Sequence, residues 1–502
     1  MDRLPTTLGA LKASGWRTRS VKAELRANLI ARIRSGQPLF EGIHGYDDTV
    51  IPALERAILA GHSINLLGLR GQAKTRMARS LVLLLDEWLP VVAGSEINDD
   101  PLAPISRYAK DLVAEKGDET PIAWLHREQR YTEKLATPDV TVADLIGDSD
   151  PIKAANLKLP YSDERVIHFG LIPRSHRGIF VINELPDLQP RIQVALFNIL
   201  QEGDVQIRGF KLRLPLDIQF VFTANPEDYT NRGAIITPLK DRIQSQILTH
   251  YPGSIELGMR ITAQEARIAP EQAARVRVPD LLRVLVERIA MEARASEYVD
   301  PRSGVSARLT ISALECLVGA AERRALRNGE ESTVARIADL WSVAPAINGK
   351  IELVYEGEQE GADSVARILI ATAIRNVFKV LFPDAVKARR AAEQAGSAPR
   401  GRDGYSALLD WFDDNQLDLL ADAPDSAHLD RLRAVPGLRE KVAGEHPYLG
   451  EEEVPLWMEF VLHGLAEHSR IGRSQIERGH RFGDVLGALL GAGQDGGEGD
   501  AP

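Results

Sequence analysis

The stretch from His62 to Leu85 contains the residues whose types and spacing could bind a phosphate group. It reads as a short apolar strand, the loop GLRGQAKT and an amphipathic helix. A phosphate-binding P-loop has two glycines separated by four residues, and the second glycine directly precedes Lys and Ser or Thr. This loop has Gly68 at the first glycine position but Ala73 at the second, before Lys74 and Thr75. Backbone N–H groups at the helix start would cradle phosphate oxygens. Lys74 would reach the β- and γ-phosphates, and the Thr75 hydroxyl would ligate Mg²⁺. The predicted nucleotide-binding set is Gly68, Gly71, Gln72, Ala73, Lys74, Thr75 and Arg76.

Two later apolar runs, GIFVINE and IQFVFTAN, end in polar residues. Such runs are typical of buried parallel strands whose C-terminal ends face a ligand. Hydrolysis of a phosphoanhydride needs a base for the water, a polar group that positions it and positive charge for the transition state. Glu184 suits the base, Asn225 the positioning group and Arg242 the charge. A lone carboxylate at the end of a buried strand costs desolvation, which favours a functional reading of Glu184.

The elements around these residues alternate between strands and helices. Strands are predicted before the P-loop and at 131–136, 178–184, 218–225 and 246–250, with a helix at 189–201 and a hairpin at 203–215. This alternation predicts a mostly parallel α/β sheet. Residues 86–129 are expected to be irregular, as functional or mobile loops often are. After residue 255 the pattern is helical, at 256–294, 306–327, 337–348 and 365–381.

The domain organisation follows from these patterns and from shifts in composition. A basic helix at 17–34 is expected to present a solvated face or to contact a neighbouring subunit. Small, basic and Gly/Pro-containing residues indicate a linker late in the chain. The predicted parts are an N-terminal helical extension (1–39), an α/β nucleotide-binding core (40–254) with an insert near 143–176, a helical lid (255–383), the linker (384–404), a C-terminal helical segment (405–490) and a disordered tail (491–502).

Composition argues against several classes of protein. The chain of 502 residues is 44% hydrophobic and 26% charged, as ordinary globular proteins are. A net charge of −10 argues against general nucleic-acid binding. With Cys316 as its one cysteine, the chain can form no internal disulfide and no multi-cysteine metal site. Apolar runs are too short for a membrane span, so we expect a cytoplasmic protein.

The order of these motifs resembles the AAA+ ATPases of the magnesium-chelatase I-subunit and MoxR-like family. Over residues 40–380, GLRGQAKT resembles Walker A, GIFVINEL Walker B, FTANPEDY the sensor 1 segment and TPLKDRI the arginine-finger segment. Arg308, opening a later helix, resembles the sensor 2 arginine, and the segment before GIFVINEL is similar to the helix-2 insert. The resemblance implies a P-loop AAA+ core, with a parallel five-stranded sheet and helices on both faces, followed by an all-α lid and a C-terminal helical segment.

The resemblance also implies ATP and Mg²⁺ as cofactors and a homo-oligomeric ring, often hexameric. Arg242 of one subunit would reach the γ-phosphate bound by its neighbour, and Arg308 would sense the nucleotide. The insert and the 203–215 hairpin would face the pore or a client. Family members commonly work with a von Willebrand factor A domain protein, which they remodel or mature.

Two residues depart from the family pattern. Asn183 replaces the aspartate that holds Mg²⁺ or its water, and the loss of a unit charge beside a divalent ion predicts weaker Mg²⁺ binding and slower turnover. Ala73 is expected to take ordinary helical dihedral angles, with a small crowding effect only.

Other functions remain open at this stage. A nucleotide-gated scaffold with little hydrolysis would fit Asn183, and magnesium insertion into a porphyrin would fit the family resemblance. A transcription activator would carry GAFTGA in its insert, and this string does not occur in the chain. The basic residues Arg208, Lys211 and Arg213 in the hairpin leave a DNA-dependent activity open, although basic stretches alone are unspecific.

Overall fold

The computed structural model describes residues 4–160, 163–207, 210, 213–226, 234–383 and 405–485. The chain forms two compact units, Met1–His250 and Tyr251–Pro502. The predicted linker (384–404) and disordered tail (491–502) lie outside the described residues, as do Arg208 and Lys211 of the hairpin.

A parallel five-stranded sheet forms the centre of the first unit. Its order is β11 (Ser245–Leu248), β1 (Ile64–Leu67), β10 (Ile218–Ala224), β7 (Gly178–Asn183) and β4 (Tyr131–Leu135). Every neighbouring pair is parallel, which confirms the predicted α/β sheet. Because β10 lies between β1 and β7, the ends of these three strands are brought together although they are far apart in the sequence.

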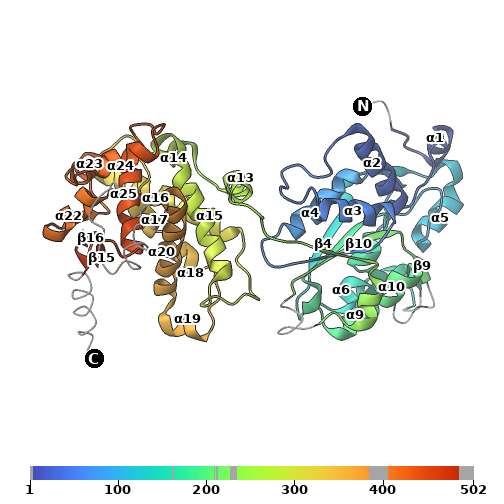
Figure 1. The fold of residues 1–502 in the computed structure, drawn as a ribbon. Helices are drawn as coiled ribbons and strands as arrows, with labels where there is room; N and C mark the ends of the chain where they lie inside the picture. Colours follow the sequence, from blue (N-terminus) through green and yellow to red (C-terminus); the bar gives the residue numbers. More distant parts are fainter. Residues whose placement is uncertain are drawn as a thin grey trace. The chain divides into compact units, whose positions relative to one another are not determined.

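Alternating residues of the buried strands separate two apolar layers. On β7, Ile179 and Val181 join one cluster, whereas Phe180 and Ile182 join the other, because successive strand residues point to opposite faces. The first face is covered by α2 (Val21–Ser35), α3 (Val50–Leu59) and α4 (Lys74–Ser80), and the second by α6 (Val142–Leu145), α9 (Pro190–Ala195) and α10 (Phe197–Glu202) (Figure 1). Helix α12 (Thr237–Arg242) also contributes Leu239 to the apolar layer on the second face.

Helix α2 contributes to the core of the first unit. Val21, Leu25 and Leu29 are buried in the cluster that also contains the β1 side chains. Glu24, on the same face of α2, forms a bidentate pair with Arg130 at two N–O distances of 2.7 Å. Residues 17–34 therefore do more than present the solvated face that their charges predict, because one side of the helix is packed on the sheet.

The stretch 86–129 is not irregular, contrary to prediction. Strand β2 (Trp88–Val92) pairs antiparallel with β3 (Ile122–His126), and α5 (Arg107–Lys116) lies between them in the chain. The sequence pattern did not indicate β2 because Pro90 lies within it, and a proline normally argues against a β-strand.

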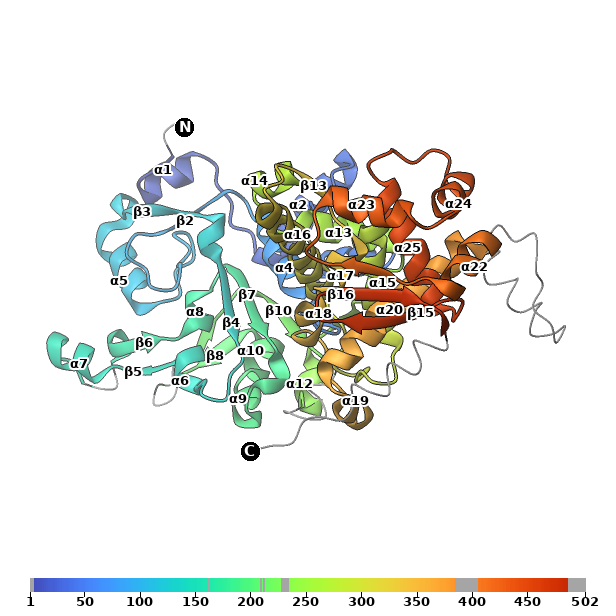
Figure 2. The same ribbon diagram turned by 90° about the vertical axis from the view of Figure 1, so that its left-hand side faces the viewer.

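The predicted insert is a short antiparallel hairpin that leads into β7. It consists of β5 (Gly147–Ser149), α7 (Pro151–Leu157), β6 (Ile167–Phe169) and α8 (Leu171–Arg174), as Figure 2 shows. The later hairpin pairs β8 (Asp204–Gln206) with β9 (Arg213–Pro215), as expected.

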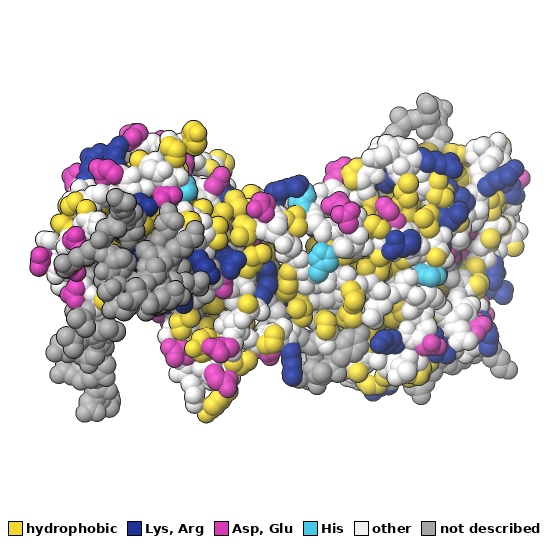
Figure 3. Space-filling model, in the orientation of Figure 1, with side chains coloured by type: hydrophobic (Ala, Val, Ile, Leu, Met, Phe, Trp, Pro, Cys, Tyr) yellow, Lys and Arg dark blue, Asp and Glu magenta, His cyan; other side chains and the backbone are white. Residues whose placement is uncertain are grey.

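The surface of the first unit carries mixed side chains. On the face seen in Figure 3, Lys and Arg side chains are interspersed with hydrophobic and uncharged ones, and those drawn in colour form no continuous basic patch. Within the described ranges, no helix has the length and apolar character needed to cross a bilayer.

The second unit is mainly helical, as predicted, but it contains strands that the sequence did not indicate. Within the predicted all-α lid, β12 (Val276–Arg277) pairs parallel with β13 (Thr333–Val334). A three-stranded antiparallel sheet joins β14 (Leu417–Leu420), β16 (Gly479–Gly483) and β15 (Gly472–Ile476). The prediction of helix alone after residue 405 is wrong here, because β15 and β16 are short, polar and rich in glycine. The helices are α13 (Ile255–Glu265), α14 (Pro270–Arg275), α15 (Asp280–Ala295), α16 (Arg308–Asn328), α17 (Ile337–Trp341), α18 (Ala344–Asn348), α19 (Tyr355–Glu360), α20 (Ala362–Leu381), α22 (Ser406–Asp414), α23 (Asp425–Arg433), α24 (Leu438–Glu445) and α25 (Val454–Glu467).

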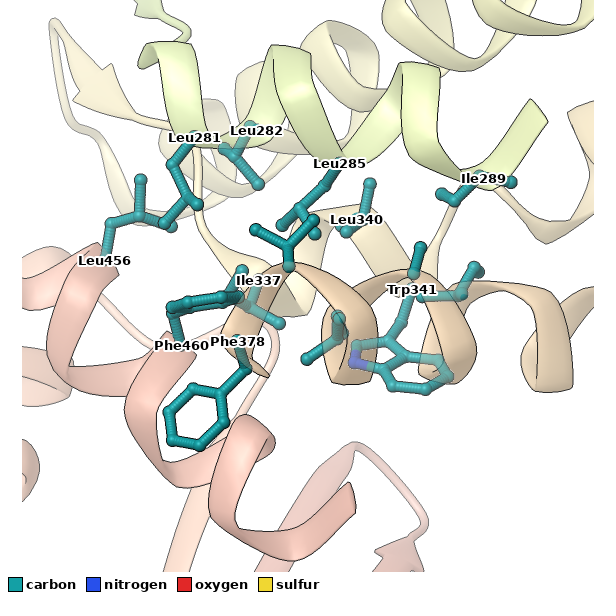
Figure 4. Close-up of a cluster of buried hydrophobic side chains, with 14 of the residues drawn as sticks. Leu281, Leu282, Leu285, Ile289, Ile337, Leu340, Trp341, Phe378, Leu456 and Phe460 are labelled. Carbon is teal, nitrogen blue, oxygen red and sulfur yellow. The ribbon is translucent and has the colours of Figure 1, made fainter. Parts of the chain in front are cut away.

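One apolar core joins residues before and after the predicted linker. Leu456 and Phe460 of α25 lie beside Leu281 and Leu285 of α15, and all four are buried (Figure 4). Residues 405–485 are therefore built into the helical unit.

Candidate nucleotide-binding site

The P-loop connects β1 to α4 in a tightly folded turn. A Cβ atom at Gly68 would lie 1.9 Å from Thr249 Oγ1 and 2.2 Å from Gln72 Oε1, so only glycine fits there. Gly71 has a φ of 73°, in the left-handed region that favours glycine. Gly68 is thus required by the side chains packed against it, and Gly71 by its left-handed backbone conformation.

Ala73 also adopts a left-handed conformation, with φ 55° and ψ 16°. The expectation of ordinary helical dihedral angles at this position is therefore wrong. In the left-handed region the Cβ atom approaches the following carbonyl oxygen, at a cost of roughly 1–2 kcal/mol for an L-residue. A glycine would avoid this cost, so Ala73 retains the loop shape with a local strain.

Side-chain hydrogen bonds from Thr249 and Tyr46 hold Gln72 of the loop in place. The Thr249 hydroxyl donates to Gln72 Oε1 at 2.6 Å. The Tyr46 hydroxyl lies 3.0 Å from the carbonyl oxygen of Gln72 and 2.9 Å from that of His250. Gln72 was predicted to belong to the site, whereas Tyr46 and Thr249 were not. Their contacts depend on long-range packing that no local sequence pattern signals.

Lys74 links the P-loop to the end of β10. Its ammonium group donates to the carbonyl oxygens of Gly68 and Leu69, the latter at 2.8 Å, and to Asn225 Oδ1 at 2.8 Å. The structure therefore brings together two residues that the sequence separates by 151 positions. Thr75 and Arg76 follow in the first turn of α4, where Thr75 is partly buried and Arg76 is exposed.

Thr223 of β10, which no sequence motif indicated, joins β10 to the end of β7. The Thr223 hydroxyl accepts the backbone N–H of Glu184 at 3.1 Å and donates to Asn183 Oδ1 at 3.2 Å. Glu184 has φ 56° and ψ 49°, a left-handed conformation that is uncommon for a non-glycine residue. Strained backbone of this kind concentrates at functional sites, and the Thr223 hydrogen bond holds it here.

The two predicted arginines lie on other elements. Arg242 ends α12, donates to Gln201 Oε1 at 3.0 Å and to the Pro238 carbonyl at 2.7 Å, and stacks on the Phe197 ring at 4.7 Å. These contacts hold it against α10. Arg308 is the exposed first residue of α16 in the second unit, where its backbone N–H donates to Ser306 Oγ at 3.2 Å.

The donor set fits a nucleotide phosphate. The loop gives a glycine-dependent turn at a helix N-terminus, which suits anions, and Lys74 adds a positive charge beside the loop carbonyl groups of Gly68 and Leu69. Glu184 and Asn225 supply an acceptor and an amide at neighbouring strand ends. Together these groups can bind a polyphosphate and orient a water molecule beside it.

The five-stranded parallel sheet with this loop after β1 defines a P-loop AAA+ fold. The chain is similar to the magnesium-chelatase 38 kDa subunit of Rhodobacter capsulatus, with 24% identity over 226 residues. The similarity covers 44% of this chain and 59% of that subunit, so somewhat more than half of the relative's length is matched. No family model matches the chain. Fold and sequence similarity together support an AAA+ ATPase of the magnesium-chelatase-like type.

Solved structures give weaker likenesses. A complex of subunits BchI and BchD of magnesium chelatase has 18% identity and a TM-score of 0.30, over 61% of this chain and 92% of that chain. NtrX from Brucella abortus in complex with ADP has 14% identity and a TM-score of 0.34, over 77% of this chain and 70% of that chain. At such scores the likeness places no individual residue.

Proposed function

We propose that this protein is an ATP-hydrolysing AAA+ motor of the magnesium-chelatase/MoxR-like type that remodels or matures a partner protein. The observation that supports it best is the hydrogen bond from Lys74 to Asn225, which follows β10, together with Glu184, which follows the neighbouring strand β7. A phosphate-binding lysine beside a carboxylate and an amide is the set that hydrolysis of a phosphoanhydride requires.

Each residue then has a defined role. The loop from Gly68 to Arg76 binds the phosphates through its N–H groups and Lys74. Thr75 is the residue whose hydroxyl would hold Mg²⁺ bound with ATP, and Asn183 stands where the family resemblance implies an aspartate that assists this ion. Glu184 accepts a proton from the attacking water, and Asn225 orients that water through its amide group.

Arg242 is assigned to the site of a neighbouring subunit. It ends α12, and its guanidinium group contacts Gln201 and Phe197 of α10. The family resemblance supports a homo-oligomeric ring, with six subunits as the expected number, whose sites are completed between subunits. On the family resemblance alone, Arg308 senses the nucleotide and a von Willebrand factor A domain protein is the partner.

The test is a complementation experiment on ATP hydrolysis. Glu184→Gln and Arg242→Ala should each lower turnover at least about a hundredfold, the usual contribution of a general base or of a charge that stabilises the transition state. Mixing the two variants should restore part of the activity, because a mixed ring contains sites with one intact Glu184 and one intact Arg242. Arg191→Ala removes an exposed arginine of the same unit and is the matched control.

Two results would count against the motor. Mixtures that stay inactive would contradict sites shared between subunits. Tight ATP binding without turnover in the unmodified protein would favour the second candidate, a scaffold whose assembly is gated by nucleotide. Asn183 is the feature that favours the scaffold, since it removes a charge that normally serves the catalytic cation.

A further inference from the structure

The side-chain amide of Asn183 is held in one orientation by Thr223. Thr223 is 2% exposed and lies on β10, which is paired with β1 on one side and with β7 on the other. Its oxygen accepts the Glu184 N–H, which leaves the hydroxyl proton free to donate. The amide oxygen of Asn183 satisfies that proton at 3.2 Å.

This contact leaves the amide NH₂ group of Asn183 to face away from Thr223. An aspartate here would offer one oxygen to Thr223 and the other to a cation. Asparagine offers its oxygen to Thr223 and only N–H donors elsewhere, and N–H donors bind anions and not metal ions. The donor set at the end of β7 therefore does not match the carboxylate ligand that Mg²⁺ favours.

We propose that Thr223 turns Asn183 into a phosphate donor, so that this site binds a nucleoside triphosphate with little dependence on a divalent cation. The inference rests on the proposed function, because it concerns the same P-loop. Two effects act in the same direction. The amide adds a hydrogen bond to a phosphate oxygen, and the missing carboxylate removes a repulsion that a cation must otherwise screen. Thr223 is thus a positioning residue, while Lys74 remains the positive charge at the site and Glu184 its carboxylate.

The experiment measures the affinity for a fluorescent, non-hydrolysable ATP analogue in Mg²⁺ and in EDTA. For the unmodified protein the dissociation constant in EDTA should be less than tenfold that in Mg²⁺. Asn183→Asp should raise this ratio above tenfold, because its carboxylate repels phosphate when no cation is present. Asn183→Ala should weaken binding about tenfold in both buffers, as expected for one lost hydrogen bond to a charged group.

Thr223 variants test the positioning role. Thr223→Ser keeps the hydroxyl and should keep the low ratio, whereas Thr223→Val frees the amide to turn and should raise the ratio. Thermal unfolding of each variant shows whether it is folded, and the two Asn183 variants carry the test if Thr223→Val is not.

The outcomes separate the inference from the function on which it rests. A ratio of tenfold or more in the unmodified protein, or an unchanged ratio in Asn183→Asp, would overturn the inference and leave an ordinary Mg²⁺-dependent site. Failure of the unmodified protein to bind the analogue in either buffer would overturn the proposed function itself.

Discussion

The ammonium group of Lys74 lies 2.8 Å from the side-chain oxygen of Asn225. The first residue starts the helix after β1, and the second follows the last residue of β10. Since β1 and β10 are neighbouring parallel strands, this hydrogen bond couples the phosphate-binding loop to the adjacent strand end.

Replacing Asn225 should separate binding from hydrolysis. Asn225→Asp puts a carboxylate beside Lys74, which would compensate its charge and repel phosphate, so ATP affinity should fall about tenfold or more. Asn225→Ala should leave affinity within about threefold, yet lower turnover at least about tenfold, because the water loses its positioning group. Nucleotide titration and phosphate release measure the two effects. Equal affinity of the two variants would contradict the coupling.

Ala73→Gly should stabilise the protein. Ala73 has a φ of 55°, and glycine adopts this conformation without the Cβ contact. The free energy of unfolding of the first unit should rise by about 1 kcal/mol. Ala78→Gly, in the following helix, should lower it. Urea unfolding of both variants gives the comparison, and a loss of stability in Ala73→Gly would show that the methyl group packs usefully.

The sequence predicts the sheet well because the pattern is local. The run 178–182 has no polar side chain, and both faces of β7 are buried as such runs require. The strands β15 and β16 lack this signal. They carry polar residues, and Phe482 is buried only because the chain returns to pack it on α25 and its neighbours.

The candidate site is predictable only in part for the same reason. The types of Lys74, Glu184 and Asn225 indicate their chemistry from single segments. The bridge from Thr223 to Asn183 depends on the register of two strands that are distant in the sequence. The left-handed backbone of Ala73 likewise follows from the path of the folded loop and not from its residue type.

The buried pair of Glu24 and Arg130 should fix α2 to the sheet. Their side chains are 3% and 1% exposed, so removing Arg130 leaves the buried Glu24 carboxylate without its bidentate partner. Arg130→Met should lower the free energy of unfolding of the first unit by about 3–5 kcal/mol. Adding Glu24→Leu should recover most of this loss, because the remaining charge is then gone. Chemical unfolding of the single and double variants measures these free energies. A small loss of stability in Arg130→Met would show that this pair does not fix α2 to the sheet.

Acid should destabilise the first unit through His176. Burial lowers the pKa of its imidazole to about 4, and Nδ1 accepts the Asp217 N–H at 2.9 Å. The unfolded chain, with a histidine pKa of about 6.5, binds the proton first, so stability is complete above about pH 6.5 and falls as the pH drops toward 4. From pH 7.5 to 5 the loss should be about 2 kcal/mol.

His176→Asn keeps an acceptor near Nδ1 but does not titrate, and it serves as the control. Its stability should decline less than that of the unmodified protein over the same pH range. Parallel declines would show that other groups cause the acid sensitivity.

Residues 405–485 should stabilise the helices that precede the predicted linker. Phe460 is completely buried and packs in the same core as Leu285 of α15, so Phe460→Ala should cost about 3–5 kcal/mol of unfolding free energy in the second unit. Tyr448→Ala alters a side chain that is 99% exposed in the same segment and should change stability by less than about 0.5 kcal/mol. Hydrogen exchange should then become faster in α15 as well as in α25 for Phe460→Ala, since both helices share one cooperative core. Faster exchange confined to α25 would mean that the C-terminal segment unfolds on its own and that the helices before residue 384 form a separate folding unit.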